Sequence, residues 1–264
     1  MISFIYSPGK LSLTQVGPMM QIIFLGTNGW YDSPTGNTIC TLINSEKYHI
    51  ILDAGNGLYK ADRYIKDELP VYLFLSHFHL DHIEGLHVLS KFRFKSLSIF
   101  GQKGTRAALH TIINEPFTVP LEKLPYPVDV RELSPGPYKL PFALDCRFLV
   151  HASPCMGYRF DLDGKTITYC PDTGVCENAV LLAADADLLI AECAHLPGEE
   201  NPAWPHLNPA AAAAIARRAK AARLALTHFD AGRYTSQQMR REAVATVEDF
   251  PGIVVGEDGL VMQL

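Results

Sequence analysis

The sequence lacks the features that place a chain in a membrane or on a nucleic acid. It has no run of about eighteen consecutive apolar residues, and its start has no long apolar segment before a small-residue cleavage site. Basic residues are not in excess, because 23 Lys and Arg stand against 28 Asp and Glu, for a formal charge of −5. These absences predict a protein that is neither secreted nor membrane-bound, and they disfavour a polyanionic partner.

Cysteine is sparse and is not arranged in the pairs of metal ribbons or redox motifs. The six cysteines show no two-residue spacing: Cys40, Cys146, Cys155, Cys170, Cys176 and Cys193. With 264 residues, of which 48% are hydrophobic, the chain can bury a substantial core without disulfides. We therefore predict reduced cysteines and a cytoplasmic location.

The pattern of apolar residues predicts an α/β fold with a second sheet stacked on the first. Residues 21–264 are predicted to form one domain, and residues 1–20 an N-terminal extension or extra hairpin. The first half is predicted to hold strands at 21–25, 38–44, 48–52, 71–75 and 97–100 and helices at 58–69, 83–89 and 105–113. The second half is predicted to hold strands at 142–150, 156–162, 166–170, 188–192 and 224–227, helices at 178–184, 210–222 and 235–249, and two short terminal strands. Prolines between these halves predict a loop with at most one strand, at 128–133.

Ligand-type residues concentrate in Ser-His-Phe-His-Leu-Asp-His at 76–82, directly after an apolar run. Neutral imidazole and carboxylate bind divalent cations such as zinc, whereas a solvated turn would leave several polar groups without a task. His151, Asp172 and His228 each follow another predicted strand, where α/β folds gather functional groups. These seven donors suffice for two metal ions if one carboxylate, most naturally Asp172, bridges them.

Other polar residues allow two interpretations. Asp53 follows the strand at 48–52, and it either holds a histidine ligand by its other ring nitrogen or caps a turn before the next helix. His87 and His110 lie inside predicted helices and are interpreted as ordinary helix histidines rather than ligands. At Asn208-Pro209 the sequence predicts a helix start.

Four motifs together resemble the metallo-β-lactamase superfamily over about residues 21–264. They are the histidine segment at 76–82, Gly-Tyr-Arg-Phe at 157–160 after His151, Tyr-Cys-Pro-Asp-Thr-Gly at 169–174 and Leu-Thr-His-Phe at 226–229. Phe-Leu-Gly-Thr at 24–27 and the later Arg233-Tyr234 add a resemblance to the ribonuclease Z branch and its phosphodiesterase relatives. The resemblance implies a four-layer αββα sandwich of two stacked mixed sheets flanked by helices. It also allows a homodimer.

The resemblance implies a dinuclear site, most naturally with Zn²⁺ and alternatively with Mn²⁺ or Fe²⁺. His77, His79 and His151 would bind one ion, Asp81, His82 and His228 would bind the other, and Asp172 would bridge them. Hydroxide between the ions would attack phosphorus. Asp81 is predicted to be catalytic as well as a ligand. His206 is the candidate acid for the leaving oxygen, although Leu-Asn follows it where the ribonuclease Z branch has Ser-Thr. His195 competes for this role.

The expected substrate is a small phosphodiester or a short nucleotide. The branch that matures transfer RNA carries a basic Gly/Pro-rich arm, and no comparable insertion occurs between Phe100 and His151, so transfer RNA is disfavoured. Two alternatives stay open: a thioester or lactone hydrolase of the same fold, and a metal-stabilised binding protein without catalysis. A diiron oxidoreductase of the same fold is disfavoured. Those related enzymes have glutamate in place of the second histidine, whereas position 79 is His.

Overall fold

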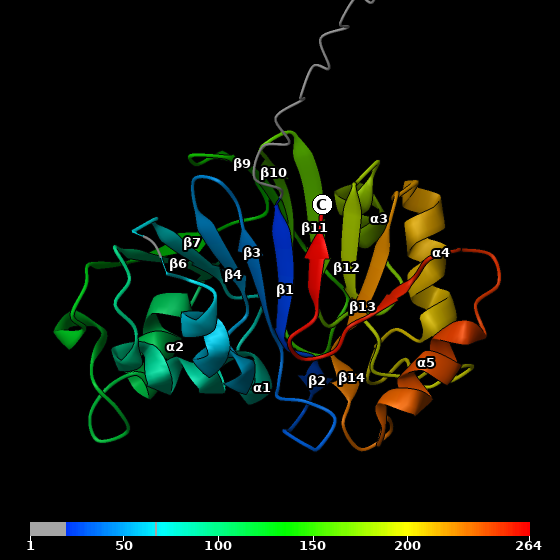
Figure 1. Ribbon diagram of the computed structural model, residues 1–264, viewed down its shortest axis with the longest axis horizontal. Coiled ribbons are helices and arrows are strands. Elements are labelled where there is room, and N and C mark those ends of the chain that lie inside the picture. The colour runs from blue at the N-terminus through cyan, green and yellow to red at the C-terminus, as the bar shows by residue number, and fades with distance from the viewer. Residues whose placement is uncertain (1–19, 67) are drawn as a thin grey trace, which may run out of the picture.

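A computed structural model describes residues 20–66 and 68–264 and has two seven-stranded sheets face to face (Figure 1). The predicted extension or hairpin at 1–20 lies, apart from Met20, outside the described residues. The first sheet has the order β16-β1-β3-β4-β5-β6-β7. Its strands are β1 (Gln21–Gly26), β3 (Cys40–Asn44), β4 (His49–Leu52), β5 (Val71–Phe74), β6 (Leu97–Gln102), β7 (Val128–Leu133) and β16 (Val261–Gln263).

The second sheet has the order β15-β13-β12-β11-β10-β9-β8. Its strands are β8 (Gly136–Lys139), β9 (Ala143–Phe148), β10 (Met156–Leu162), β11 (Lys165–Cys170), β12 (Leu188–Glu192), β13 (Leu224–Thr227) and β15 (Val254–Val255). Both sheets are mixed, because β4 to β7 and β11 to β15 pair in parallel whereas the remaining neighbours are antiparallel.

Helices cover the outer face of each sheet and complete the predicted αββα sandwich (Figure 1). The first sheet carries η1 (Asn56–Arg63), α1 (Leu80–Ile83), η2 (Glu84–Lys91), α2 (Thr105–Ile112) and η3 (Leu121–Lys123), where η denotes a 3₁₀ helix. The second carries α3 (Glu177–Ala183), α4 (Pro209–Ala219) and α5 (Gln237–Ala245). Among the described residues, no helix is long and apolar enough to span a membrane.

Central strands such as β4, β12 and β13 are mostly apolar because both of their faces are buried. In β4, Ile51 packs under the helices of the first sheet, whereas Leu52 points into the layer between the sheets. Aromatic rings fill that layer: Phe74 stacks on Phe100 with centroids 4.8 Å apart and meets Phe160 of the opposite sheet edge-on at 4.9 Å. The inter-sheet layer therefore fixes how the two halves of the chain meet.

Several predicted boundaries were wrong. The helix predicted at 58–69 ends at Arg63, because the chain must extend again before Pro70 and β5. The helix predicted at 83–89 is the 3₁₀ helix η2, joined to α1. Strand β8 lies in the segment predicted as loop, and its Pro137 is tolerated because β8 is an edge strand. The helix predicted at 210–222 ends at Ala219, where Lys220 takes a left-handed φ of 55°.

A third, two-stranded sheet joins the halves of the chain. It pairs β2 (Asn28–Gly29) with β14 (Phe229–Asp230) in parallel. Arg240 of α5 is fully buried behind it, donates hydrogen bonds to Asn28 and to the Thr27 hydroxyl, and lies 4.6 Å over the Phe229 ring. Burial lowers the pKa of Arg240 to about 10, so the guanidinium stays charged near neutral pH. These contacts of Arg240 hold the loop after β1 against α5.

Candidate metal centre

The structure brings all seven predicted ligand residues together at one edge of the two sheets. His77 and His79 follow β5, and Asp81 and His82 lie in α1, whose N-cap residue is His79. The other three, His151, Asp172 and His228, follow β9, β11 and β13. The strand-end positions noted in the sequence therefore converge, although they come from both halves of the chain.

One group of donors consists of His77, His79, His151 and Asp172, whose ligand atoms lie within 4.8 Å of one another. Asp172 Oδ2 is 3.6 Å from His151 Nε2 and 3.8 Å from His77 Nε2. His151 Nε2 lies 3.4 Å from His79 Nδ1. These atoms surround one point, as binding to a single cation requires.

A second group consists of Asp81, His82 and His228. Here the other oxygen of Asp172, Oδ1, lies 3.1 Å from His82 Nε2 and 3.3 Å from His228 Nε2. Asp81 Oδ2 lies 3.2 Å from His228 Nε2. The two carboxylate oxygens of Asp172 thus face different groups, which is the geometry of a bridging ligand.

Gly29 lets the loop after β1 approach this second group. A Cβ at position 29 would lie 2.5 Å from Cε1 of the His228 ring, which is closer than real Cβ contacts allow. His228 itself has a left-handed φ of 53° at the end of β13. Its ring is therefore held between the third sheet and the metal centre.

Asp53 holds His82 in place, which decides between the two interpretations of this aspartate. Its Oδ2 lies 2.8 Å from His82 Nδ1 and accepts a 2.7 Å hydrogen bond from the Tyr169 hydroxyl. Ser76 donates to Asp53 from both its backbone N–H and its hydroxyl. Helix η1 has Gly55 at its N-cap, with no side-chain cap bond. Asp53 therefore orients a ring whose other nitrogen faces the centre.

Two serines play the same part for the first group. The Ser76 hydroxyl lies 2.9 Å from His77 Nδ1, and the Ser153 hydroxyl lies 3.2 Å from His79 Nε2. This leaves His77 Nε2 and His79 Nδ1 pointing into the centre. Among the described residues, His77 Nε2 has no hydrogen-bond partner although it is buried, which is costly unless another ligand satisfies it.

The protonation states in the first group suit a divalent cation. Burial lowers the pKa of His77, His79 and His151, so these rings are neutral and have free lone pairs. Burial raises the pKa of Asp172, but the nearby His228 and His82 outweigh it and hold the pKa well below its usual range. Three neutral imidazoles and an ionised carboxylate form a chemically apt ligand set for zinc.

The second group favours positive charge. Burial lowers the pKa of His82, but Asp172, Asp81 and Asp53 outweigh burial and raise it. The pKa of His228 is also raised, because Asp172 and Asp81 again outweigh burial. The same carboxylates that favour protons on the two rings would also attract a metal cation bound among these groups. The residues of both groups therefore fit metal ions.

His206 lies beside the centre and is paired with a buried carboxylate. Its Nδ1 is 2.7 Å from Oε1 of Glu192, the last residue of β12. Burial lowers the pKa of His206, but the Glu192 carboxylate outweighs it and raises the pKa to about 9. Glu192 is itself fixed by backbone N–H groups of Thr173 at 2.9 Å and Ala194 at 2.8 Å.

His195, the competing candidate, is less accessible. It is 2% exposed, its ring lies 5.6 Å behind that of His206, and it is not among the residues lining the cleft. Glu192 was predicted only as the end of a buried strand. An acidic residue at a strand end was, however, the same signal that singled out Asp53.

A cleft of about 640 Å³ opens over the centre and is lined by Asp81, Asp172, His206 and His228. Its lining also includes four residues that sequence reasoning did not select, Trp30, Glu84, Trp204 and Asp230, together with Leu80 and Arg233 of the motifs noted in the sequence. The cleft makes the centre accessible to a small molecule, which a closed structural metal site would not need.

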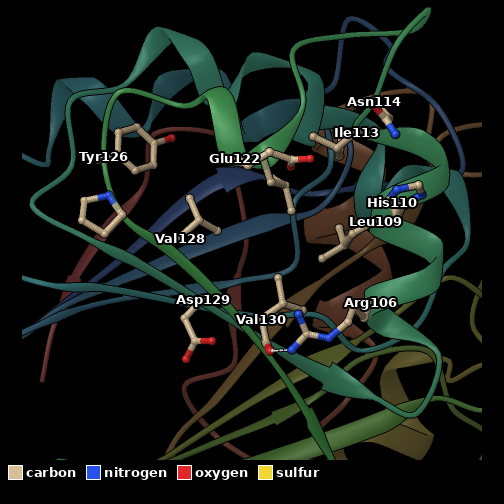
Figure 2. Close-up of a pocket in the computed structure, with 12 residues that line it drawn as sticks. Arg106, Leu109, His110, Ile113, Asn114, Glu122, Tyr126, Val128, Asp129 and Val130 are labelled. Atoms are coloured by element: carbon tan, nitrogen blue, oxygen red, sulfur yellow. Dashed lines mark hydrogen bonds between the residues drawn. The ribbon is translucent and has the colours of Figure 1, made fainter.

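A second hollow, of about 510 Å³, lies between α2 and β7 (Figure 2). His110 lines it, and Arg106 is engaged by the carbonyl of Val130. Every group of three or more metal-type side chains among the described residues belongs to the centre, and none includes His110 or His87.

The stacked sheets and the paired donor groups define an αββα sandwich with a candidate metal centre at one edge of its sheets. A family model described as a beta-lactamase superfamily domain matches residues 48–229. The chain belongs to this superfamily, and the resemblance seen in its motifs is confirmed.

Individual relatives agree with this assignment. The chain is 27% identical to the probable metallo-hydrolase YhfI of Bacillus subtilis (strain 168), over 80% of this chain and 87% of that protein. It is 26% identical to ribonuclease Z of Haloarcula marismortui, over 91% of this chain and 96% of that enzyme. The crystal structure of human tRNase Z, short form, superposes with a TM-score of 0.71 at 24% identity, over 92% of this chain and 98% of that one. The chain is a hydrolytic enzyme of this superfamily.

Proposed function

We propose that the chain hydrolyses a small phosphodiester or a short nucleotide with two divalent metal ions, most naturally Zn²⁺. The observation that carries the proposal is the position of Asp172, whose two oxygens each face a separate donor group. Bound there, two cations would supply an activated water and offset the charge that builds on phosphoryl oxygens. His77, His79 and His151 would hold one ion, Asp81, His82 and His228 the other.

His206 is proposed as the acid that protonates the leaving oxygen. Its ring lies within reach of Asp172 and His228, and the Glu192 carboxylate keeps it charged near neutral pH. An alkoxide is a poor leaving group, so a proton delivered in the transition state speeds its departure. The position of His206 in the cleft, with His195 behind it, supports this choice.

Asp81 is proposed to act as a ligand whose oxygen facing the second group, Oδ2, is fixed by the loop after β1. The backbone N–H of Trp30 donates to Asp81 Oδ2 at 2.7 Å, and the same oxygen lies 3.2 Å from His228 Nε2. This hydrogen bond would keep Asp81 in position beside His82 and His228 while the substrate enters. Substitution of Asp81 should therefore reduce both metal retention and turnover.

A small substrate is favoured over transfer RNA. Arg233 is the one Lys or Arg side chain in the described lining, and it is already bonded to Glu199 at 2.9 Å and Asp230 at 2.6 Å. Because phosphate contacts dominate nucleic-acid affinity, a long polyanion would find little to bind in this cleft.

The test begins with elemental analysis of the purified protein, followed by hydrolysis of a chromogenic phosphodiester and a chromogenic thioester by the same sample. We expect turnover of the chromogenic diester, and we expect His206→Ala to slow strongly the hydrolysis of a diester with an alkoxide leaving group, which needs the proton. His87→Ala, which removes an exposed histidine outside the centre, is the matched control and should leave the rate unchanged. Turnover of the thioester alone would contradict the proposal and favour an acyl hydrolase.

A further inference from the structure

Both tryptophans of the chain line the cleft over the metal centre. The sequence contains two, Trp30 and Trp204, and their exposed fractions are 70% and 47%. Large exposed aromatic side chains gathered at one opening are typical of binding sites, because leaving them in water is unfavourable. Neither indole side chain has a part in the mechanism above.

Trp30 is held beside the second donor group in a strained conformation. Its φ is 74°, in the left-handed region that bulky residues rarely adopt. The hydrogen bond from its N–H to Asp81 maintains this conformation, and the neighbouring Asn28 is tied to the buried Arg240. Strain that the surroundings hold in place concentrates at functional sites. A bulky side chain in this strained conformation at the cleft points to a contact with ligand.

Trp204 stands beside the first donor group. Its ring is parallel to that of His79, with an interplanar angle of 9° and centroids 5.9 Å apart. It also meets His151 edge-on at 5.6 Å. Trp30 is thus joined through its backbone to Asp81 of the second group, the Trp204 ring lies beside His79 of the first group, and both residues line the cleft.

The charge of the lining limits what the rest of a substrate can carry. Asp81, Glu84, Asp172 and Asp230 contribute carboxylates, while Arg233 is engaged by two acidic partners. Metal ions would offset the carboxylates that bind them, but Glu84 and Asp230 stay outside the ligand set. The described lining thus offers no unpaired basic side chain for a second phosphate.

We propose that Trp30 and Trp204 form an aromatic clamp for the planar groups of a diester that carries a single negative charge, such as a dinucleoside monophosphate. The phosphate would lie at the metal centre, and a base on each side would stack on one indole. This inference rests on the proposed phosphodiesterase function and adds that the substituents of the diester are aromatic.

The same tryptophans allow a direct binding test, because they are the only indole fluorophores of the chain. The metal-loaded protein would be titrated with a methylene-phosphonate analogue of a dinucleoside monophosphate, which resists cleavage at the bridging position. A dialkyl phosphate of equal charge is the comparison ligand. Stacking should quench the fluorescence with the aromatic analogue, and the dialkyl phosphate should bind about ten-fold more weakly or worse.

Single variants separate the two sides of the clamp. In Trp30→Ala the remaining Trp204 reports binding, and in Trp204→Ala the remaining Trp30 does. Each variant should bind the aromatic analogue about ten-fold more weakly than the unaltered protein does. The difference in affinity between the aromatic analogue and the dialkyl phosphate should therefore become smaller. Phe117→Ala is the matched control, because Phe117 is 74% exposed and does not line the cleft. Metal content, measured on every sample, should match the unaltered protein.

Two results would overturn the clamp: equal affinity for the aromatic and dialkyl ligands, or unchanged affinity for the aromatic analogue in both tryptophan variants with metal content intact. Neither result would affect the proposed function if diester hydrolysis is observed. Conversely, quenching by the aromatic analogue that the two variants weaken would support the clamp even if hydrolysis of a chromogenic diester failed.

Discussion

Replacing Glu192 by Gln would remove the negative charge behind His206 while keeping the shape of the side chain. Glu192 is fully buried, so the charge acts on His206 across 2.7 Å with little screening by solvent. A hydrogen bond between charged partners is worth about 1.5–3 kcal/mol. The interaction favours the protonated ring, so its loss lowers the pKa of His206 and, at a pH above the lowered value, reduces the protonated fraction and with it the rate by about ten- to a hundred-fold.

The assay is a series of phosphodiesters with leaving groups of graded acidity. A leaving alkoxide needs a proton, whereas a nitrophenolate leaves without one, so Glu192→Gln should slow the first class far more than the second. Metal content and the unfolding midpoint are measured on the same samples. This control is needed because Glu192 accepts hydrogen bonds from two backbone N–H groups, and the NH₂ group of Gln could not accept them. An equal loss across the series, with metal content intact, would refute the role of the Glu192–His206 pair.

Three further substitutions test how the fold supports the centre. Asp53→Asn should weaken metal binding by about 10- to 100-fold, because His82 loses the carboxylate that orients it, and a competition titration with a chelator measures this. Gly29→Ala should displace the His228 ring and reduce both diester turnover and metal content. A variant with full activity would show that the loop after β1 moves to make room for the added Cβ. Phe74→Ala should lower the free energy of unfolding by about 3–5 kcal/mol in a denaturant titration, because it opens a cavity between the sheets. A loss below about 1 kcal/mol would mean that the layer collapses around the gap.

The ligand residues could be predicted because their signal is local. His77, His79, Asp81 and His82 lie within six positions of one another, and the remaining ligands follow apolar runs that are easily recognised as strands. Parallel strands bring their ends to a common edge, so the convergence follows from the fold class. The division into two sets around Asp172 was implied by the resemblance to the superfamily, and the structure holds both sets as well as a third group of Asp172, His206 and His228.

The residues that shape the cleft could not be predicted in the same way. Trp204 comes from a loop more than a hundred residues beyond His79, and no periodicity relates the two. Glu192 looks like the polar end of a buried strand until the loop that carries His206 folds back over it. Helix ends were also poorly predicted, because left-handed caps such as Lys220 and 3₁₀ turns depend on local backbone geometry more than on composition.

The central claim is a site that needs two metal ions bridged by Asp172. The most direct measurement is a titration of metal-free protein with Zn²⁺, in which bound metal and phosphodiester hydrolysis are followed together, with Asp172→Ala alongside. We predict that hydrolysis rises only as the second equivalent binds, and that Asp172→Ala loses both high-affinity binding and turnover. Full activity with one ion, or an active Asp172→Ala variant, would contradict the dinuclear site.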